Sequence, residues 1–478
     1  MEGGIAVLLT SPAFIFLFLP FSLCFYALIG KERRRTCLTV IFFFYHILVN
    51  LSAPLNMLYL PCLTVYSYFS AKLLRVKKSR VLCILLCALP YIVLFVARWL
   101  AYFGPSGFVY PIGFTIAVLF STSYIVTQYR QPRQMLGSIL DLILYMLFFP
   151  AMIVGPIIRY EDFVRLVAKS EISFDRTNLA SGARIFSIGL IKRIAVGAVL
   201  YEMYDVFYSL FRDTPNLVVT IFILVTVYFA FFFTIAGYVD MCVGLSRMYG
   251  LSFETFTVAD PFRASTFTVY FGNLFTGLSL WIDDYLVTPL ISCIPEGKKR
   301  IPSFIRAVCY GFVAMLFIRS TPVMLLLSAI VVALFYIGFR FRIDEYLSTR
   351  SGLRALTTFF TMTAVAVIWV FITMGDPKLI VDYIGDITGE NAEYRVDQLL
   401  STFSWLKYVF VMIVAGLAMW VSRIESYALA PELSKQRVYP LAQYISFVLV
   451  LVLFCFTVIF FLPQFSVYDS VPFLRLFI

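Results

Sequence analysis

Histidine is almost missing from this chain of 478 residues: the sequence contains one, His46. A zinc site needs several side-chain ligands, so a lone histidine excludes the usual multi-histidine metal centre. Nine cysteines are present, but they form no C-x-x-C pair and no metal-ligand spacing, which argues against zinc and against a disulfide framework. Phosphate-binding glycine-rich loops and the G-x-S-x-G motif are missing as well. We therefore expect no metal and no bound cofactor.

Charge is also scarce: 14% of the residues are charged, whereas 61% are hydrophobic and the mean hydropathy is +0.91. A soluble domain has about 25% charged residues, so this composition excludes an ordinary soluble fold. The apolar runs are long and continuous, without the alternation of a membrane β-barrel. The sequence therefore predicts an all-α, polytopic membrane protein with roughly eleven to thirteen transmembrane or re-entrant helices.

The few charges are mostly basic, giving a formal net charge of +11. Lysine and arginine gather in short clusters between apolar runs, at residues 31–35, 75–80 and 129–133. This distribution follows the positive-inside rule and places the clusters on the cytoplasmic side, so nucleic acid is not an expected partner. Residues 5–29 lack a basic n-region and a cleavage site, which favours a retained first helix over a signal peptide. We expect a multi-pass protein of a cell membrane.

Prolines and glycines interrupt two of the apolar runs. Pro54 and Pro61 divide residues 37–73, which predicts two passes or a kinked hairpin. Pro150 and Pro156 break the run at residues 139–158, and broken backbone at membrane depth is tolerated only where it lines protein or a cavity. A charged, amphipathic segment follows at residues 159–176, which we expect either at the membrane interface or as an ordinary solvated loop.

Ionisable side chains lie within or beside the apolar sequence at residues 231–290. They include Asp240, Asp284 and Tyr238, and such groups usually face a cavity or the protein interior. Lys192 lies upstream in another apolar run, where we expect it to reach the membrane surface or to pair with a buried acid such as Asp205. Residues 231–290 are therefore the default candidate site.

Four segments, in order, resemble motifs of the membrane-bound O-acyltransferases, in the bacterial branch that modifies alginate or teichoic acid. Residues 140–163, LDLILYMLFFPAMIVGPIIRYEDF, resemble the family's FFPxxxxGPIxRYxxF segment most specifically. Residues 110–130, 182–207 and 231–251 resemble its SYxxDxYR, GLxKK and SGYSDM helices. The resemblance implies one domain over residues 1–478, with N-terminal helices (1–135), a family core (136–345) and C-terminal helices (346–478). It further implies a ring of tilted helices around a central tunnel, where a histidine activates an acceptor hydroxyl.

Both histidines of the family pattern are replaced. The family's FWRRWHISLSxWLRDYL aligns with residues 270–286, YFGNLFTGLSLWIDDYL, which puts Phe275 at the histidine position. The second box, LWHGA, aligns with FIRST, which puts Arg319 at its histidine. The resemblance implies that the substrate tunnel is lined by residues from several motifs, namely Phe275, Trp281, Tyr285, Asn273, Thr234 and Arg159.

Three functions remain open. In the first, the chain is a degenerate member that keeps the scaffold and binds membrane lipid, an envelope glycan or a partner such as a second family member or an SGNH-type acyltransferase. In the second, it is an active O-acyltransferase using acyl-CoA or an acyl carrier, with Asp240 or Asp284 as base. Tyr238 or Tyr285 would then be the hydroxyl partner and Arg319 the oxyanion stabiliser. In the third, it transports a lipid-linked glycan.

Overall fold

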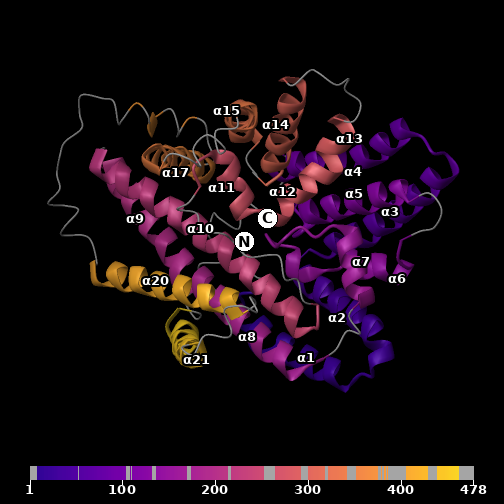
Figure 1. Ribbon diagram of the computed structural model, residues 1–478, viewed down its shortest axis with the longest axis horizontal. Helices are drawn as coiled ribbons and strands as arrows, with labels where there is room; N and C mark the ends of the chain where they lie inside the picture. Colours follow the sequence, from indigo (N-terminus) through magenta and orange to yellow (C-terminus); the bar gives the residue numbers. More distant parts are fainter. Residues whose placement is uncertain are drawn as a thin grey trace.

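The computed structural model describes residues 8–51, 53–103, 108, 110–131, 136–169, 174–213, 217–251, 264–291, 300–317, 321–341, 351–374, 378, 382–383, 385, 405–428 and 439–461. Throughout this part of the chain the regular elements are all helices, and no strand occurs. The all-α prediction is therefore confirmed. Figure 1 shows the long helix α10 (Leu217–Met248) crossing the middle of the molecule, with the other helices around it.

The N-terminal helices form one side of the molecule in Figure 1. Residues 37–73 make two helices, as the prolines predict, because a 3-10 turn at Pro54–Leu58 separates α2 from α3. Helix α5 is buried along nearly its whole length between α3 and α4, so it forms the core of this bundle. The elements are η1 (Phe14–Phe18), α1 (Leu19–Leu28), α2 (Arg34–Val49), α3 (Tyr59–Val76), α4 (Arg80–Phe103) and α5 (Phe114–Arg130).

The proline-rich run begins as a helix and then loses regular structure. Helix α6 (Ile139–Met146) starts with a capping box, in which Ser138 and Asp141 satisfy each other's backbone N–H groups. After a 3-10 turn (Phe149–Ala151) the chain is irregular but buried until α7 (Tyr160–Lys169). The Tyr145 hydroxyl donates to the Ile158 carbonyl at 2.6 Å and so satisfies one of the freed backbone groups.

Glycines let α10 and α8 (Arg176–Leu190) pack backbone to backbone. A Cβ added at Gly189 would lie 2.6 Å from the Gly237 carbonyl oxygen, and one at Gly237 would lie 2.7 Å from that of Gly189. Gly182 and Gly244 face each other in the same way one to two turns along. Small residues at a crossing allow this close approach, and it fixes α10 against α8 and the π-helix η5 (Ile191–Ala198) that continues it.

The remaining helices complete the bundle around α10. Helix α9 (Val199–Asp213) and α17 (Ser351–Met374) both pack against α10. The others are α11 (Phe267–Leu274), α12 (Thr276–Ile282), the π-helix η7 (Asp283–Val287), α13 (Thr288–Ile291), α14 (Arg300–Met315), α15 (Thr321–Phe341), α20 (Trp405–Ala428), α21 (Tyr439–Phe456) and η9 (Thr457–Phe461).

Several of these helices are long and apolar enough to cross a membrane. Four qualify within the described ranges, and a fifth is added if the bent pair around Phe275 counts as one span. They are Arg80–Ala101, Leu217–Met248, Gly352–Met374 and Tyr444–Phe461. Five shorter apolar helices accompany them. The protein is thus a multi-pass membrane protein, while the expected eleven to thirteen crossings stay a prediction.

Candidate functional site

The site is built where the irregular segment after α6 meets a sharp bend in the chain. Helix α11 and the helix that follows it, Gly277–Ile291, meet at 104°, and Phe275 occupies the corner between α11 and α12. Its φ of −121° and ψ of 54° are not helical, so the helix is interrupted at this residue. The corner brings the Phe275 ring opposite Phe317, which follows α14; the ring centroids are 6.3 Å apart and the rings nearly parallel.

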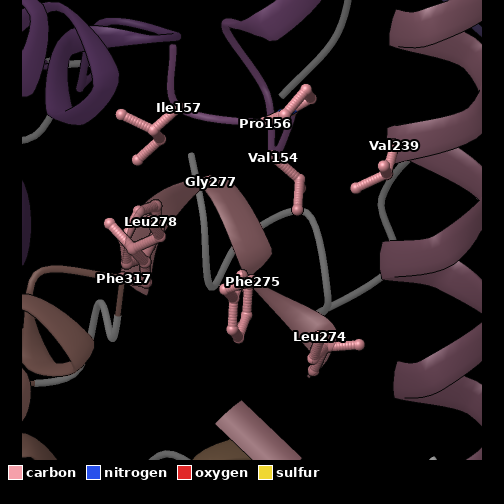
Figure 2. A pocket seen from close by; sticks show the side chains of 10 residues that line it. Val154, Pro156, Ile157, Val239, Leu274, Phe275, Gly277, Leu278 and Phe317 are labelled. Atoms are coloured by element: carbon pink, nitrogen blue, oxygen red, sulfur yellow. The ribbon is translucent and has the colours of Figure 1, made fainter. Parts of the chain in front are cut away.

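Two cavities meet at this pair of rings. The first, shown in Figure 2, lies between the Val154–Ile157 backbone, Val239 of α10 and the bend. The second, which we call the apolar cavity, lies between α10, α11, α14, α15 and α17. Phe275 and Phe317 line both cavities. The expectation that the broken backbone lines a cavity is confirmed.

Of the six residues expected to line a tunnel, Phe275 is the one that lines these cavities. Thr234 is buried on α10, where a Cβ added to Gly197 of η5 would meet its hydroxyl at 2.7 Å. Trp281 is fully buried 5.4 Å from the ring of Tyr285, whose hydroxyl lies 3.0 Å from that of Thr127. Asn273 is half-buried on α11. Their part in a substrate passage stays a prediction.

The carboxylate of Asp240 is bonded to a lysine. Lys192 of η5 donates to it at 2.6 Å, and both side chains are largely buried, with exposed fractions of 8% and 17%. The partner of Lys192 is therefore Asp240 and not Asp205, because η5 packs directly on α10. The next residue, Arg193, lies over the ring of Tyr238 at 5.4 Å from its centroid. Asp240, the candidate base, and Tyr238, its proposed hydroxyl partner, therefore each lie against a basic side chain of η5.

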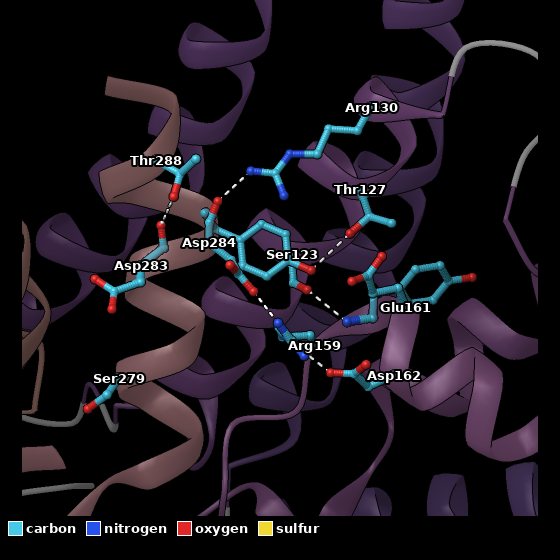
Figure 3. A network of polar contacts seen from close by, with 12 residues as sticks. Ser123, Thr127, Arg130, Arg159, Glu161, Asp162, Ser279, Asp283, Asp284 and Thr288 are labelled. Carbon is cyan, nitrogen blue, oxygen red and sulfur yellow. Dashed lines mark hydrogen bonds and ion pairs between the residues drawn. The ribbon is translucent and has the colours of Figure 1, made fainter. Parts of the chain in front are cut away.

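The adjacent Asp283 and Asp284 bind arginines of different segments, and Figure 3 shows the bond from Arg159 to Asp284. Arg306 of α14 holds Asp283 with two bonds, of 3.0 and 2.6 Å, while Arg159 binds the Asp284 carboxylate. Arg159 also bonds Asp162 at 2.6 Å. Burial alone would lower the pKa of the Arg159 guanidinium, but its bonds to Asp284 and Asp162 outweigh this and raise the pKa above its usual value.

Further contacts hold this network together. Arg130, at the end of α5, donates to the Asp284 carbonyl and lies 5.4 Å from the centroid of the Tyr285 ring. Both aspartates belong to the π-helix η7, and π-helical turns frequently occur at functional sites. Arg319, the other residue placed at a histidine position, lies outside the described residues. Within the ranges described, no three histidine, cysteine or acidic side chains gather as metal ligands would.

Sequence patterns missed most of the lining of the apolar cavity. Phe231, Val331 and Trp369 come from helices far apart in the sequence, and each looks like an ordinary core residue on its own. The counter-ions Arg306 and Lys192 were also not matched to their acids. Such pairings depend on which helices become neighbours, and no spacing within one helix reveals that.

The fold and site define an all-α polytopic membrane protein with buried ion pairs and an internal cavity pair. No family model matches the chain. It is similar to the probable alginate O-acetylase AlgI of Pseudomonas aeruginosa, with 27% identity over 304 residues, which is 59% of this chain and 56% of that protein. It is also 29% identical to the probable alginate O-acetylase AlgI of Azotobacter vinelandii over 182 residues, which is 38% of this chain and 35% of that protein. A peptidoglycan O-acetyltransferase of Helicobacter pylori is 23% identical over 233 residues, covering 43% and 42%.

These matches agree with the resemblance drawn from the motifs, because the relatives are named as O-acetylating proteins of bacteria. The chain spans 56% of the length of the Pseudomonas aeruginosa relative, and 35% and 42% of the other two.

Proposed function

We propose that this chain is a membrane subunit of an envelope-glycan O-acylation system, with the acyltransferase scaffold but without its histidine chemistry. The main support for this proposal is the position of Phe275. The motif alignment puts this residue where the family has a histidine, and its ring stacks on Phe317 between the two cavities. A general base must accept a proton within hydrogen-bonding reach of its substrate. A phenyl ring has no atom that can do so.

The carboxylates of α10 and η7 support the same proposal. Asp240, Asp283 and Asp284 are each bonded to a lysine or arginine. None of them is a lining residue of either cavity at the bend. A carboxylate that already faces a cation, away from the cavity, is poorly placed to activate a hydroxyl there. This arrangement favours a structural role over the alternative of a relocated base.

The substrate class comes from the relatives, whose names refer to alginate and peptidoglycan. We place the chain beside an acceptor glycan of the envelope and beside a catalytic partner, either a histidine-bearing relative or an SGNH-type acyltransferase. In this arrangement the partner would take the acyl group from acyl-CoA or an acyl carrier. The chain's own contribution is to bind and position components within the membrane.

The proposal is tested by deleting the gene in its own host and measuring ester-linked acyl groups on the envelope glycans after mild base hydrolysis. We expect the acyl content to fall on deletion and to return with the wild-type chain, with Asp240→Asn and with Asp284→Asn, provided that each accumulates normally. The purified chain alone should release no acyl group from a labelled donor. Unchanged acyl content on deletion would refute the proposal, and turnover that Asp240→Asn or Asp284→Asn abolishes would establish the relocated base instead.

A further inference from the structure

The apolar cavity has a lining that suits one kind of ligand. Among the residues that the structure describes, its walls carry no charged side chain, and apart from a methionine thioether the polar side-chain atoms are those of Tyr270 and Trp369. These two are bonded to each other, since the Trp369 indole N–H donates to the Tyr270 hydroxyl at 3.4 Å. A polar ligand would lose its hydrogen bonds to water without replacement, whereas an aliphatic chain would gain from leaving water.

Candidate membrane-spanning helices border the apolar cavity. Two of its walls, α10 and α17, are candidate membrane spans, and Phe231 and Trp369 stack between them at 4.1 Å. The surrounding bilayer is therefore the nearest source of aliphatic chains.

An aromatic pair lies where the apolar cavity meets the first cavity. Phe275 and Phe317 line both of them, and the Val154–Ile157 segment lines the first. Phe271 packs on Phe275 with ring centroids 5.0 Å apart, which supports the Phe275 ring from the α11 side. A chain in the apolar cavity that extended towards the first cavity would meet the Phe275 ring.

We propose that the apolar cavity holds one acyl chain of a membrane phospholipid, and that Phe275 sets how far that chain penetrates. The headgroup stays at the bilayer surface, since the described part of the lining offers no charged side chain to receive it. This role is separate from the proposed part in glycan acylation, because the lipid is a bound component and not a substrate.

Two neighbouring residues of α15 provide a matched test. Val331 is 2% exposed and lines the cavity, whereas Ile330 is 47% exposed on the outer face. Protein washed in detergent is analysed by native mass spectrometry for retained phospholipid. We expect the wild type and Ile330→Phe to retain one phospholipid, and Val331→Phe to retain it about tenfold less. Equal retention by the two variants would overturn the proposal. Should Val331→Phe not yield monodisperse protein, Ala314→Leu fills the same cavity with a smaller addition.

Fluorescence identifies the source of the chain. A phospholipid brominated on its acyl chain should quench the emission component that Trp369→Phe removes, because that indole lines the cavity. Quenching by a brominated free fatty acid but not by the phospholipid would overturn the assignment to phospholipid. Phe275→Ala should shift the retained lipids towards longer chains, whereas Phe271→Ala, at a ring that lines only the apolar cavity, should not. An unchanged distribution with Phe275→Ala would remove that residue from the proposal.

Discussion

Asp283 and Asp284 are consecutive residues whose carboxylates bind arginines from opposite sides, Arg306 of α14 and Arg159 of the segment before α7. The two ion pairs join the segment before α7 to α14 through a single π-helical turn, and Figure 3 shows the pair between Arg159 and Asp284. Asp240 forms the third pair, but with Lys192 in a more enclosed setting. Burial therefore distinguishes the pairs, and it decides how much each should contribute to stability.

Removing one partner of the enclosed pair should cost more than removing one partner of the exposed pair. We expect Asp240→Asn to destabilise the protein by about 3 kcal/mol, because it leaves Lys192 charged and buried. Asp284 is 38% exposed, so Asp284→Asn should cost no more than about 1 kcal/mol. The midpoint of thermal unfolding in detergent measures both, with Asp175→Asn on the surface as the control. A larger loss for Asp284→Asn would contradict this order.

The crossing of α8 and α10 predicts a strong effect of small substitutions. Gly237→Ala would place a Cβ 2.7 Å from the Gly189 carbonyl oxygen, and the backbones would have to separate. We expect a loss of about 2 kcal/mol or more, since overpacking of a tight contact typically costs 1–3 kcal/mol.

Gly416→Ala is the matched control for this substitution. That glycine is also within a helix, α20, but no atom lies within 4 Å of an added Cβ. Alanine is favoured over glycine in helices by about 1 kcal/mol, so this variant should be neutral or slightly more stable. If both variants lower the unfolding midpoint alike, close packing at Gly237 is not the cause.

Restoring the histidine alone should not restore acyl transfer. Phe275→His would place an imidazole between two cavities whose described lining residues include no carboxylate to orient it. A catalytic histidine usually depends on such a partner for its tautomer and position. We expect the purified variant to release labelled acyl groups from a donor no faster than the wild type. A clear gain of turnover would mean that the remaining machinery is intact and that the residue at position 275 alone abolishes activity.

The sequence predicted the features that depend on composition and on local breaks in the chain. The all-α membrane class, the division of residues 37–73 and the irregular segment around Pro150 and Pro156 were all predictable, because apolar length and proline act locally. The ion pairs between different helices were not predictable from the sequence. Lys192 was matched to Asp205, which lies on the succeeding helix, although the helix that packs on η5 brings Asp240 to it.

The candidate site shows the same division. Phe275 was located by motif alignment alone, and the structure places it at a bend between two cavities. The apolar cavity could not be predicted, since its walls come from five helices and its residues carry no distinctive chemistry. A cavity arises from the way helices pack, and that packing is set by contacts between distant segments.

The glycine contact between α8 and α10 has one more consequence. Val239 faces the first cavity, and the next residue, Asp240, faces Lys192. Successive residues of a helix are about 100° apart around its axis. If α10 turned about its axis by that angle, Asp240 would replace Val239 at the first cavity. The close contact between Gly189 and Gly237 fixes the rotation of α10 and so keeps this carboxylate out of the cavity.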